Sequence, residues 1–175
     1  MRSTIDKNNF MNVQATSTEI YPSITTRLQT QHESIQVIIS TINSKQLDWR
    51  VAPDKWNIHE TIAHLVCYQA MFTDRVVQAL TEEVPFFPKY DADKDRDFKY
   101  WCTDDIQHLI LQLFSDREKL VKLIAKITNE DANRIAMHKK YGSHNIVLWV
   151  EFFLLHEAHH IYQIFQLAYN IEMKN

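Results

Sequence analysis

The chain has 175 residues and a mass of 20.8 kDa, which is enough for one domain with a full hydrophobic core. One glycine and four prolines are too few turn residues for an all-β fold or for a glycine-rich phosphate-binding loop, so the composition predicts an all-α fold. A formal net charge of −3 without a run of Lys or Arg argues against a nucleic-acid-binding surface.

Cysteine usage and hydropathy predict the cellular compartment. Cys67 and Cys102 lack the CxxC spacing of a thiolate metal site and are too few for a disulfide framework. No apolar run reaches the roughly 20 residues of a membrane span, and the polar N-terminus is unlike a signal peptide. We therefore expect a cytoplasmic protein with no membrane or nucleic-acid partner.

The first part of the chain predicts an arm followed by a helix. Residues 1–18 show no periodicity and little hydrophobicity, which predicts a flexible arm, and residues 19–175 are expected to form a single helical bundle domain. From Pro22 to about Asn43 the apolar residues recur at helical spacing: Ile24, Leu28, Ile35, Ile38 and Ile42. His32 lies between two polar residues, which favours a solvated or hydrogen-bonded histidine at the helix edge over a metal ligand.

A second helix is predicted from Asn57, a suitable N-cap, to about Leu80. One stripe of this helix is apolar: Ile58, Ile62, Leu65, Phe72 and Val76. An adjoining stripe is more polar: His64, Tyr68, Met71 and Arg75. Periodicity alone does not decide whether His64 faces the interior.

A long connection and a third helix follow. Residues 81–102 contain two prolines and a run of mixed charge, which predicts a solvated crossover long enough to traverse a bundle. Thr103 is expected to cap the third helix, with Asp104 and Asp105 in its first turn. The apolar stripe of this helix is Ile106, Leu109, Leu113, Leu120, Ile124 and Ile127.

The last part of the chain predicts a short turn of helix at residues 128–133 and a loop at residues 137–142, which holds the only glycine. Ser143 is expected to cap a fourth helix, whose apolar residues run from Ile146 to Leu167 without Gly or Pro. Four amphipathic helices with one long crossover connection are typical of a four-helix bundle, whose core is a usual place for a metal site.

Two histidines of the fourth helix are candidate metal ligands. The inward seam of this helix alternates spacings of three and four residues: Trp149, Phe153, His156, His160, Gln163 and Leu167. Because His156 and His160 are four residues apart, both imidazoles can bind one cation. Burying two imidazoles without strong partners costs about 1 to 3 kcal/mol each, which favours a metal over two hydrogen-bonded core histidines. Helical spacing does not identify which residue would be the third ligand.

A second stripe of the fourth helix is also apolar and contains Phe152, Leu155 and Tyr162 beside His159. His159 lies about 100° from His160 around the helix axis, so it faces away from the seam. A helix that is apolar on two sides needs a packing partner outside its own bundle. This stripe therefore predicts a homodimer, in which a second copy of the chain covers it.

Two other classes of metal site share parts of the pattern. Residues 156–160 read HEAHH and so satisfy the HExxH motif of zincin proteases. No sheet is predicted beside this helix to bind an extended peptide, which argues against a protease. A di-iron bundle requires inward glutamates and two ExxH repeats, which the sequence lacks.

Short motifs follow one another in a specific order: KWNI at residues 55–58 leading into ETIAHL at 60–65, PFFP at 85–88, Arg117, YGS at 141–143 and HEAHHIYQI at 156–164. Their combination resembles the DinB-like (DinB/YfiT) superfamily over about residues 22–168. The resemblance implies a four-helix bundle that binds a divalent metal, commonly zinc or nickel, through one histidine of the second helix and two of the last. The matching positions are His64, His156 and His160.

The resemblance also implies a class of function. Three neutral imidazoles leave coordination positions open, as in a catalytic metal site. Some members of the superfamily are thiol S-transferases and others have been described as hydrolases, so we expect a metal-dependent reaction on a small-molecule substrate or thiol. The alternative is a non-catalytic helical stress or interaction protein with a structural or vestigial metal site.

Three further residues lie within one helical turn of the expected ligands. Glu60 and Glu157 could assist a reaction, but a surface carboxylate, or one that orients a ligand, is the favoured interpretation of each. Cys67 could approach the metal, but a small buried core residue is favoured. The tryptophans and phenylalanines are expected in the core.

Overall fold

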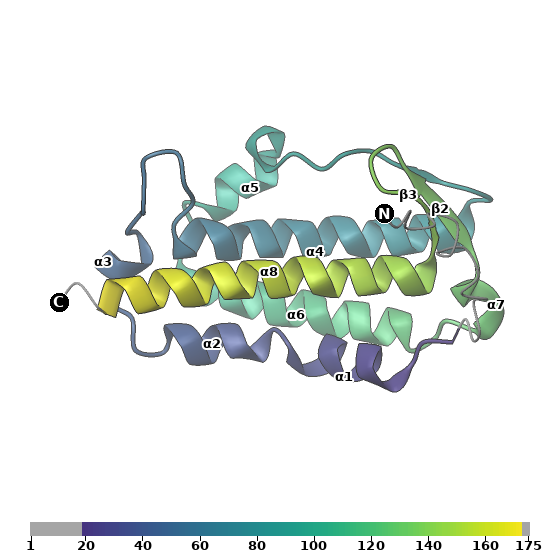
Figure 1. The fold of residues 1–175 in the computed structure, drawn as a ribbon, viewed down its shortest axis with the longest axis horizontal. Helices are drawn as coiled ribbons and strands as arrows, with labels where there is room; N and C mark the ends of the chain where they lie inside the picture. Colours follow the sequence, from purple (N-terminus) through teal and green to yellow (C-terminus); the bar gives the residue numbers. More distant parts are fainter. Residues whose placement is uncertain (1–18, 173–175) are drawn as a thin grey trace, which may run out of the picture.

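The computed structural model describes residues 19–172, so the expected arm at residues 1–18 lies outside the described range. Four helical segments run side by side along the longest axis of the molecule (Figure 1). They are α1 (Pro22–Thr30) with α2 (Glu33–Ile39), α4 (Ile58–Thr81), α6 (Ile106–Ile124) and α8 (Ile146–Glu172). The predicted all-α four-helix bundle with one long crossover is confirmed, with a small sheet added at one end.

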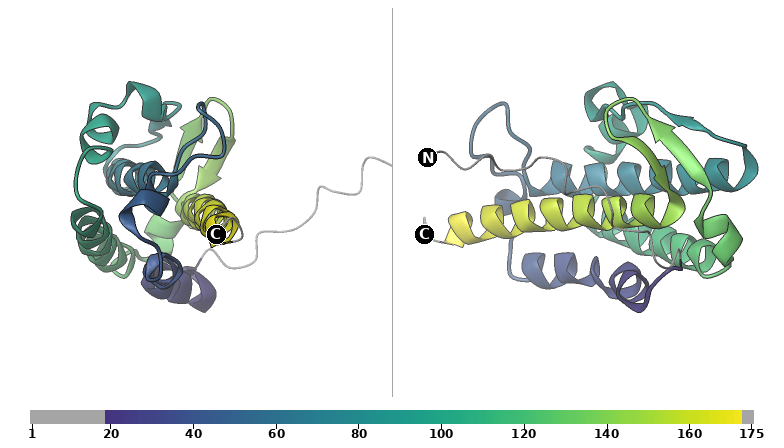
Figure 2. Two further views of the ribbon diagram at one scale, coloured as in Figure 1. Left: turned by 90° about the vertical axis from the view of Figure 1, so that its left-hand side faces the viewer. Right: turned by 45° about the vertical axis from the view of Figure 1, so that its right-hand side comes forward.

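The helices are arranged as a ring. α4 packs on both α6 and α8, while α1 packs on α6 and α8 from the other side and α2 extends the contact with α8 (Figure 2). Their apolar stripes meet in the middle, where many side chains are at most 2% exposed, among them Ile24, Leu28, Phe72, Leu113, Leu120 and Phe153. Each such side chain stabilises the fold by about 1.5 to 3 kcal/mol, and the buried apolar residues form two core clusters.

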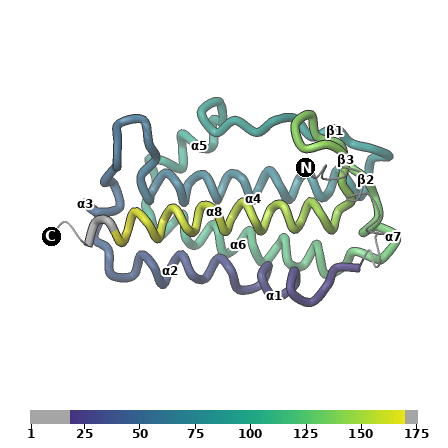
Figure 3. Tube along the Cα trace, in the orientation of Figure 1, coloured from purple at the N-terminus to yellow at the C-terminus, as the bar shows by residue number. Residues whose placement is uncertain are grey.

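The first predicted helix is broken. It divides into α1 and α2 at Gln31 and His32, and α2 ends at Ile39, before a short helix α3 (Ser44–Leu47) (Figure 3). The Gln31 side chain donates a hydrogen bond to Leu154 O of α8 at 3.0 Å. The N–H of Ile35 donates to His32 O three residues earlier, which is the tighter 3₁₀ pattern. His32 is 4% exposed, so its predicted edge position is wrong.

The start of α4 confirms the predicted cap. Asn57 Oδ1 accepts a hydrogen bond from the N–H of Glu60 at 2.7 Å, and the Glu60 carboxylate accepts one from the N–H of Asn57 at 3.0 Å. The same carboxylate binds both terminal nitrogens of Arg50, at 2.5 and 2.7 Å. The Glu60 carboxylate is therefore occupied by capping α4 and by its ion pair with Arg50.

The crossover is more ordered than the sequence predicted. It contains β1 (Phe86–Phe87), a 3₁₀ turn (Ala92–Lys94) and α5 (Arg96–Trp101), and it passes over α4 (Figure 1). Phe87 and Phe98 are buried against the bundle, so the segment is packed and not merely solvated. α6 begins later than predicted, because Asp105, and not Thr103, accepts the capping hydrogen bond from the N–H of Gln107 at 2.8 Å.

The loop predicted at residues 137–142 is a β-hairpin. β2 (Ile135–His138) pairs antiparallel with β3 (Gly142–Asn145), and β1 joins β2 in parallel. Gly142 has a φ of 81°, a left-handed conformation that glycine adopts without strain. The preceding short helix α7 (Asn129–Ala132) confirms the predicted turn of helix.

α8 begins at the end of this hairpin. Ser143 lies in β3, so its predicted capping role is wrong. The side chain of Asn145 accepts a hydrogen bond from the N–H of Leu148 at 3.0 Å and caps the helix in its place.

The outer stripe of α8 is exposed in the described chain. Leu155 and Tyr162 are each 59% exposed, and Phe165 and Tyr169 lie further along the same helix at 52% and 53%. The homodimer that this stripe suggests stays a prediction. Within residues 19–172, no helix combines the length and apolar character that crossing a membrane requires.

Candidate metal centre

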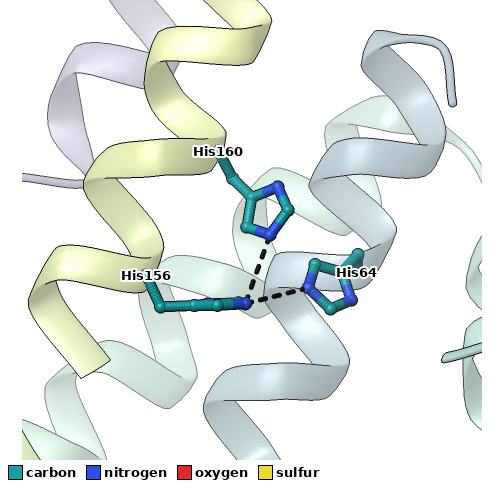
Figure 4. A group of neighbouring side chains, drawn as sticks. All are labelled: His64, His156 and His160. Carbon is teal, nitrogen blue, oxygen red and sulfur yellow. Dashed lines mark hydrogen bonds between the residues drawn. The ribbon is translucent and has the colours of Figure 1, made fainter. Parts of the chain in front are cut away.

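Three histidines meet between α4 and α8. His64 extends from α4 and His156 and His160 from α8, with their ring nitrogens directed toward one another (Figure 4). Nε2 of His156 lies 3.3 Å from Nε2 of His64 and 3.2 Å from Nε2 of His160. His64 and His160 are buried and His156 is half-buried. The structure thus brings together all three residues expected as metal ligands.

The spacing of these nitrogens fits a shared ion. Two imidazole nitrogens at about 2.1 Å from one metal, with about 100° between the two bonds, lie about 3.2 Å apart. The nitrogen pairs at 3.2 and 3.3 Å match this value. The two pairs that His156 forms therefore suit a shared divalent cation, and the ligand atoms of all three residues lie within 4.8 Å of one another.

Gln163 fixes the tautomer of His160. His160 Nδ1 lies 2.7 Å from Gln163 Oε1, an amide oxygen that only accepts, so Nδ1 carries the proton and Nε2 presents its lone pair. Gln163 Nε2 in turn lies 3.1 Å from His159 Nε2 and donates to it. His159 is exposed and outside the cluster, as predicted, yet it orients the amide that orients a candidate ligand.

Aromatic rings enclose the other two histidines. Tyr68 stacks on His156 with 3.7 Å between ring centroids, and the Trp56 ring lies 4.8 Å from that of His64. Nδ1 of His64 and Nδ1 of His156 are buried and have no hydrogen-bond partner among the described residues. Because such a buried polar atom costs about 1 to 3 kcal/mol, the cluster does not satisfy itself by hydrogen bonding.

Burial keeps the three imidazoles neutral. Desolvation lowers the pKa of His64 to about 3, of His156 to about 2 and of His160 to about 4. For His64 and His156 these pKa values include a smaller contribution from the neighbouring imidazoles. Neutral imidazole is the form that binds metal, so protons do not compete for these lone pairs at neutral pH.

Cys67 and Glu157 do not join the histidines. Cys67 is 5% exposed, burial raises the pKa of its thiol to about 12, and it packs in the core as predicted. Glu157 follows His156 in sequence but contacts α6 and the α1–α2 segment. It is 1% exposed, so the interpretation of Glu157 as a surface carboxylate is wrong.

Glu157 belongs to a second buried polar cluster that the sequence did not reveal. Its carboxylate pairs with both terminal nitrogens of Arg117 and accepts a hydrogen bond from Gln31 Nε2 at 2.8 Å. Arg117 Nε donates to Gln69 Oε1 of α4 at 2.6 Å, and Arg117 Nη1 donates to Leu28 O at 3.2 Å. This cluster ties together all four segments of the bundle.

Two cavities flank the three histidines. One, of about 510 Å³, lies beside His160, between α8 and residues 51–56. The other, of about 300 Å³, reaches His64 and His156 and is bordered by the crossover and the hairpin. A small molecule in either cavity would therefore contact the histidine cluster.

Comparison with known proteins gives a family and several relatives. The sequence model of the DinB superfamily matches residues 27–164. The protein named "Putative metal-dependent hydrolase OB0413", from Oceanobacillus iheyensis, is 23% identical over 143 residues, which are 79% of this chain and 79% of that protein. "Uncharacterized protein YuaE" from Bacillus subtilis is 24% identical over 159 residues, which are 83% of this chain and 94% of that protein.

A solved structure has the same fold. YfiT from Bacillus subtilis, described as "a probable metal-dependent hydrolase with an unusual four-helix bundle topology", superimposes with a TM-score of 0.75. The match covers 86% of each chain at 19% sequence identity. The arrangement of helices is therefore shared between the two proteins.

Proposed function

The chain belongs to the DinB superfamily, and we propose that it is a metal-dependent enzyme in which His64, His156 and His160 hold one divalent ion. The observation that carries this proposal is the convergence of the Nε2 atoms of two buried histidines and one half-buried histidine, with spacings of 3.2 and 3.3 Å. Converging Nε2 atoms of neutral imidazoles offer lone pairs that suit a divalent cation. Zinc and nickel both suit a site of three imidazole nitrogens.

The proposed reaction is hydrolysis of a small molecule, with transfer of a thiol as the second candidate. Hydrolysis comes first because the Oceanobacillus relative and YfiT are both described as hydrolases. A bound divalent ion would supply a Lewis acid that lowers the pKa of a water or thiol and polarises the group under attack.

Among the chain's own side chains, Tyr68 is placed to assist the reaction. It stacks on His156 and lines the smaller cavity. Burial raises the pKa of Tyr68 to about 12, so its hydroxyl stays protonated and can donate to a substrate oxygen. Glu60 and Glu157 are both bound to arginines, which argues against either carboxylate as a general base.

Metal analysis of protein purified without an affinity tag tests the proposed ion. After incubation with zinc or nickel, we expect about one equivalent in the wild type and less than about a tenth in the His156→Ala variant. His108→Ala is the matched control, because His108 is an exposed histidine outside the cluster and its loss should leave the metal content unchanged. Less than about a tenth of an equivalent in the wild type would contradict the proposal.

Activity panels test the reaction. Metal-loaded protein is assayed with hydrolase substrates and, separately, with thiols and electrophiles. We expect turnover that disappears when all three histidines are replaced by alanine. Turnover no higher than that of the triple variant would favour the non-catalytic alternative, a stress or interaction protein that holds its ion structurally.

A further inference from the structure

Arg75 lies on the same face of α4 as His64 and Tyr68, and the three-histidine cluster does not use it. Eleven residues separate Arg75 from His64, which corresponds to about 20° around the helix axis and about 16 Å along it. Arg75 is 8% exposed, and it lines the same cavity of about 300 Å³ that reaches His64 and His156. One end of this cavity therefore touches a candidate metal site, and the other touches a buried guanidinium.

The guanidinium of Arg75 has no carboxylate partner among the described residues. Its Nη2 donates to Pro88 O, and the group lies 5.2 Å from the centre of the Phe87 ring. A guanidinium carries five N–H donors, so this environment leaves most of them for another acceptor. Burying a charge without a counter-charge is costly, and the buried Arg117 shows the usual solution with its partner Glu157.

The other charged groups that line this cavity are two lysines and two aspartates. Lys89 and Lys140 are exposed at its border, and neither forms an ion pair with a described residue. The two acidic residues of the lining are Asp91 and Asp93, and Asp91 is paired with Lys94 at 3.0 Å. The unpaired positive charge in and around the cavity thus exceeds the unpaired negative charge, which favours an anionic occupant.

We propose that Arg75 binds an oxyanion of the substrate, a carboxylate or a phosphate, while the reacting group of the same molecule lies at the three histidines. This inference rests on the proposed metal-dependent function. Arginine binds both kinds of oxyanion through two parallel hydrogen bonds, which also fixes the orientation of the ligand. The substrate class is a small, elongated molecule with an anionic group at one end, and Tyr68 lies along α4 between the two binding points.

Hydroxamic acids with a terminal carboxylate test this arrangement, because the hydroxamate binds a metal ion and the carboxylate can reach an arginine. The series has about two to six methylene groups, since the side chains shorten the distance of about 16 Å between the Cα atoms. In zinc-loaded wild-type protein, we expect the best carboxylate to bind at least about tenfold more tightly than its methyl ester. The Arg75→Met variant should lose this gain in affinity of the carboxylate over the ester. It should bind the ester as tightly as the wild type does.

Two variants control the measurement. Arg134 is a half-buried arginine outside the cavity, bound to Ala79 O and Glu82 O at 2.6 Å each, so Arg134→Met should keep the full gain. Arg75→Lys keeps the charge but not the planar fork, and we expect it to reduce the gain at least about threefold. It serves as the test if Arg75→Met does not fold, and an undiminished gain in a folded Arg75 variant would overturn the inference.

The outcomes separate this inference from the proposed function. Equal binding of carboxylate and ester by the wild type would overturn the oxyanion site and leave the metal centre intact. If the protein retains no metal, the proposed function fails, and the test moves to metal-free protein with inorganic phosphate and succinate. We then expect either anion to raise the melting temperature of the wild type but not of Arg75→Met, and no shift in the wild type would overturn the oxyanion site.

Discussion

Two consecutive residues of α8 belong to two different buried polar clusters, which lie on different sides of the helix. His156 faces α4 and joins His64 and His160, a group of like, neutral rings whose lone pairs converge. Glu157 faces α6 and the α1–α2 segment, where it pairs with Arg117. The two clusters share a helix and a degree of burial, but they differ in whether their polar atoms find partners.

The buried polar cluster of Arg117, Glu157, Gln69 and Gln31, which we call the Arg117 cluster, has its charged groups paired. Both carboxylate oxygens of Glu157 accept hydrogen bonds, and Arg117 donates to Glu157, Gln69 and Leu28 O. The histidine cluster leaves two ring nitrogens without partners among the described residues. A metal ion at the three Nε2 atoms would bind their converging lone pairs and leave the two Nδ1 atoms as they are, so the case for a ligand rests on the convergence of the Nε2 atoms. The first cluster is therefore structural, and the second is the candidate functional site.

The Glu157→Ala substitution should have the largest effect on stability. It leaves the guanidinium of Arg117 buried without its counter-charge, so we expect the free energy of unfolding to fall by about 3 to 5 kcal/mol. Urea denaturation of metal-free protein, followed by circular dichroism, measures this loss.

Glu151 offers a matched control on the same helix. Its carboxylate also binds an arginine through two hydrogen bonds, to Arg27 at 2.8 and 2.6 Å, but the two side chains are 22% and 31% exposed. Glu151→Ala should therefore cost only about 0.2 to 1 kcal/mol. Equal losses for the two variants would show that the buried pair is not the structural element that we infer.

The parts of the molecule that the sequence predicted depend on local spacing. The capping box of Asn57 and Glu60 joins residues three apart, and the pairing of His156 with His160 joins residues four apart. Helical geometry fixes both distances before any tertiary structure is considered. The third candidate ligand, His64, lies on another helix, and only the resemblance to a family could place it in the site.

The parts that the sequence missed depend on contacts between distant segments. Arg117 and Glu157 are 40 residues apart, and helical periodicity does not reveal that two separate helices face each other with opposite charges. The break at Gln31 has no Pro or Gly to mark it, and the Gln31 side chain makes a hydrogen bond to α8 that the sequence does not reveal. The hairpin at residues 135–145 was hidden for a similar reason, since its strands are short and one of them pairs with the crossover.

The Gln163→Leu substitution should have an effect of intermediate size, and this effect should be confined to metal binding by the histidine cluster. The amide oxygen holds the proton of His160 on Nδ1, so its loss frees the ring to rotate and to change tautomer. Loss of such an orienting contact typically lowers metal affinity about 10- to 100-fold. Competition with a chromophoric chelator measures the change. Gln166→Leu, an exposed glutamine of the same helix, is the control, and equal affinity in the Gln163 variant and the wild type would contradict the orienting role.

His32→Gln should have the smallest effect, on how stability depends on pH. His32 Nδ1 lies 3.5 Å from Arg117 Nη1, and desolvation together with the positive charge of Arg117 lowers the pKa of His32 from 6.5 to about 4. Between these values the unfolded chain binds a proton that the folded protein does not, so the free energy of unfolding falls as the pH falls. One such group contributes at most about 1.4 kcal/mol per pH unit.

The variant removes that contribution, because glutamine does not titrate. Urea denaturation in the presence of a chelator keeps the metal site out of the comparison. Between about pH 6.5 and 4.5, we expect the free energy of unfolding to fall by about 1 to 2 kcal/mol less in His32→Gln than in the wild type. The packing cost of the substitution is read separately at pH 7.5, where both states of the wild type are mostly neutral at His32. An identical fall in the two proteins would mean that His32 is protonated in the folded state, and that the Arg117 cluster tolerates a second positive charge.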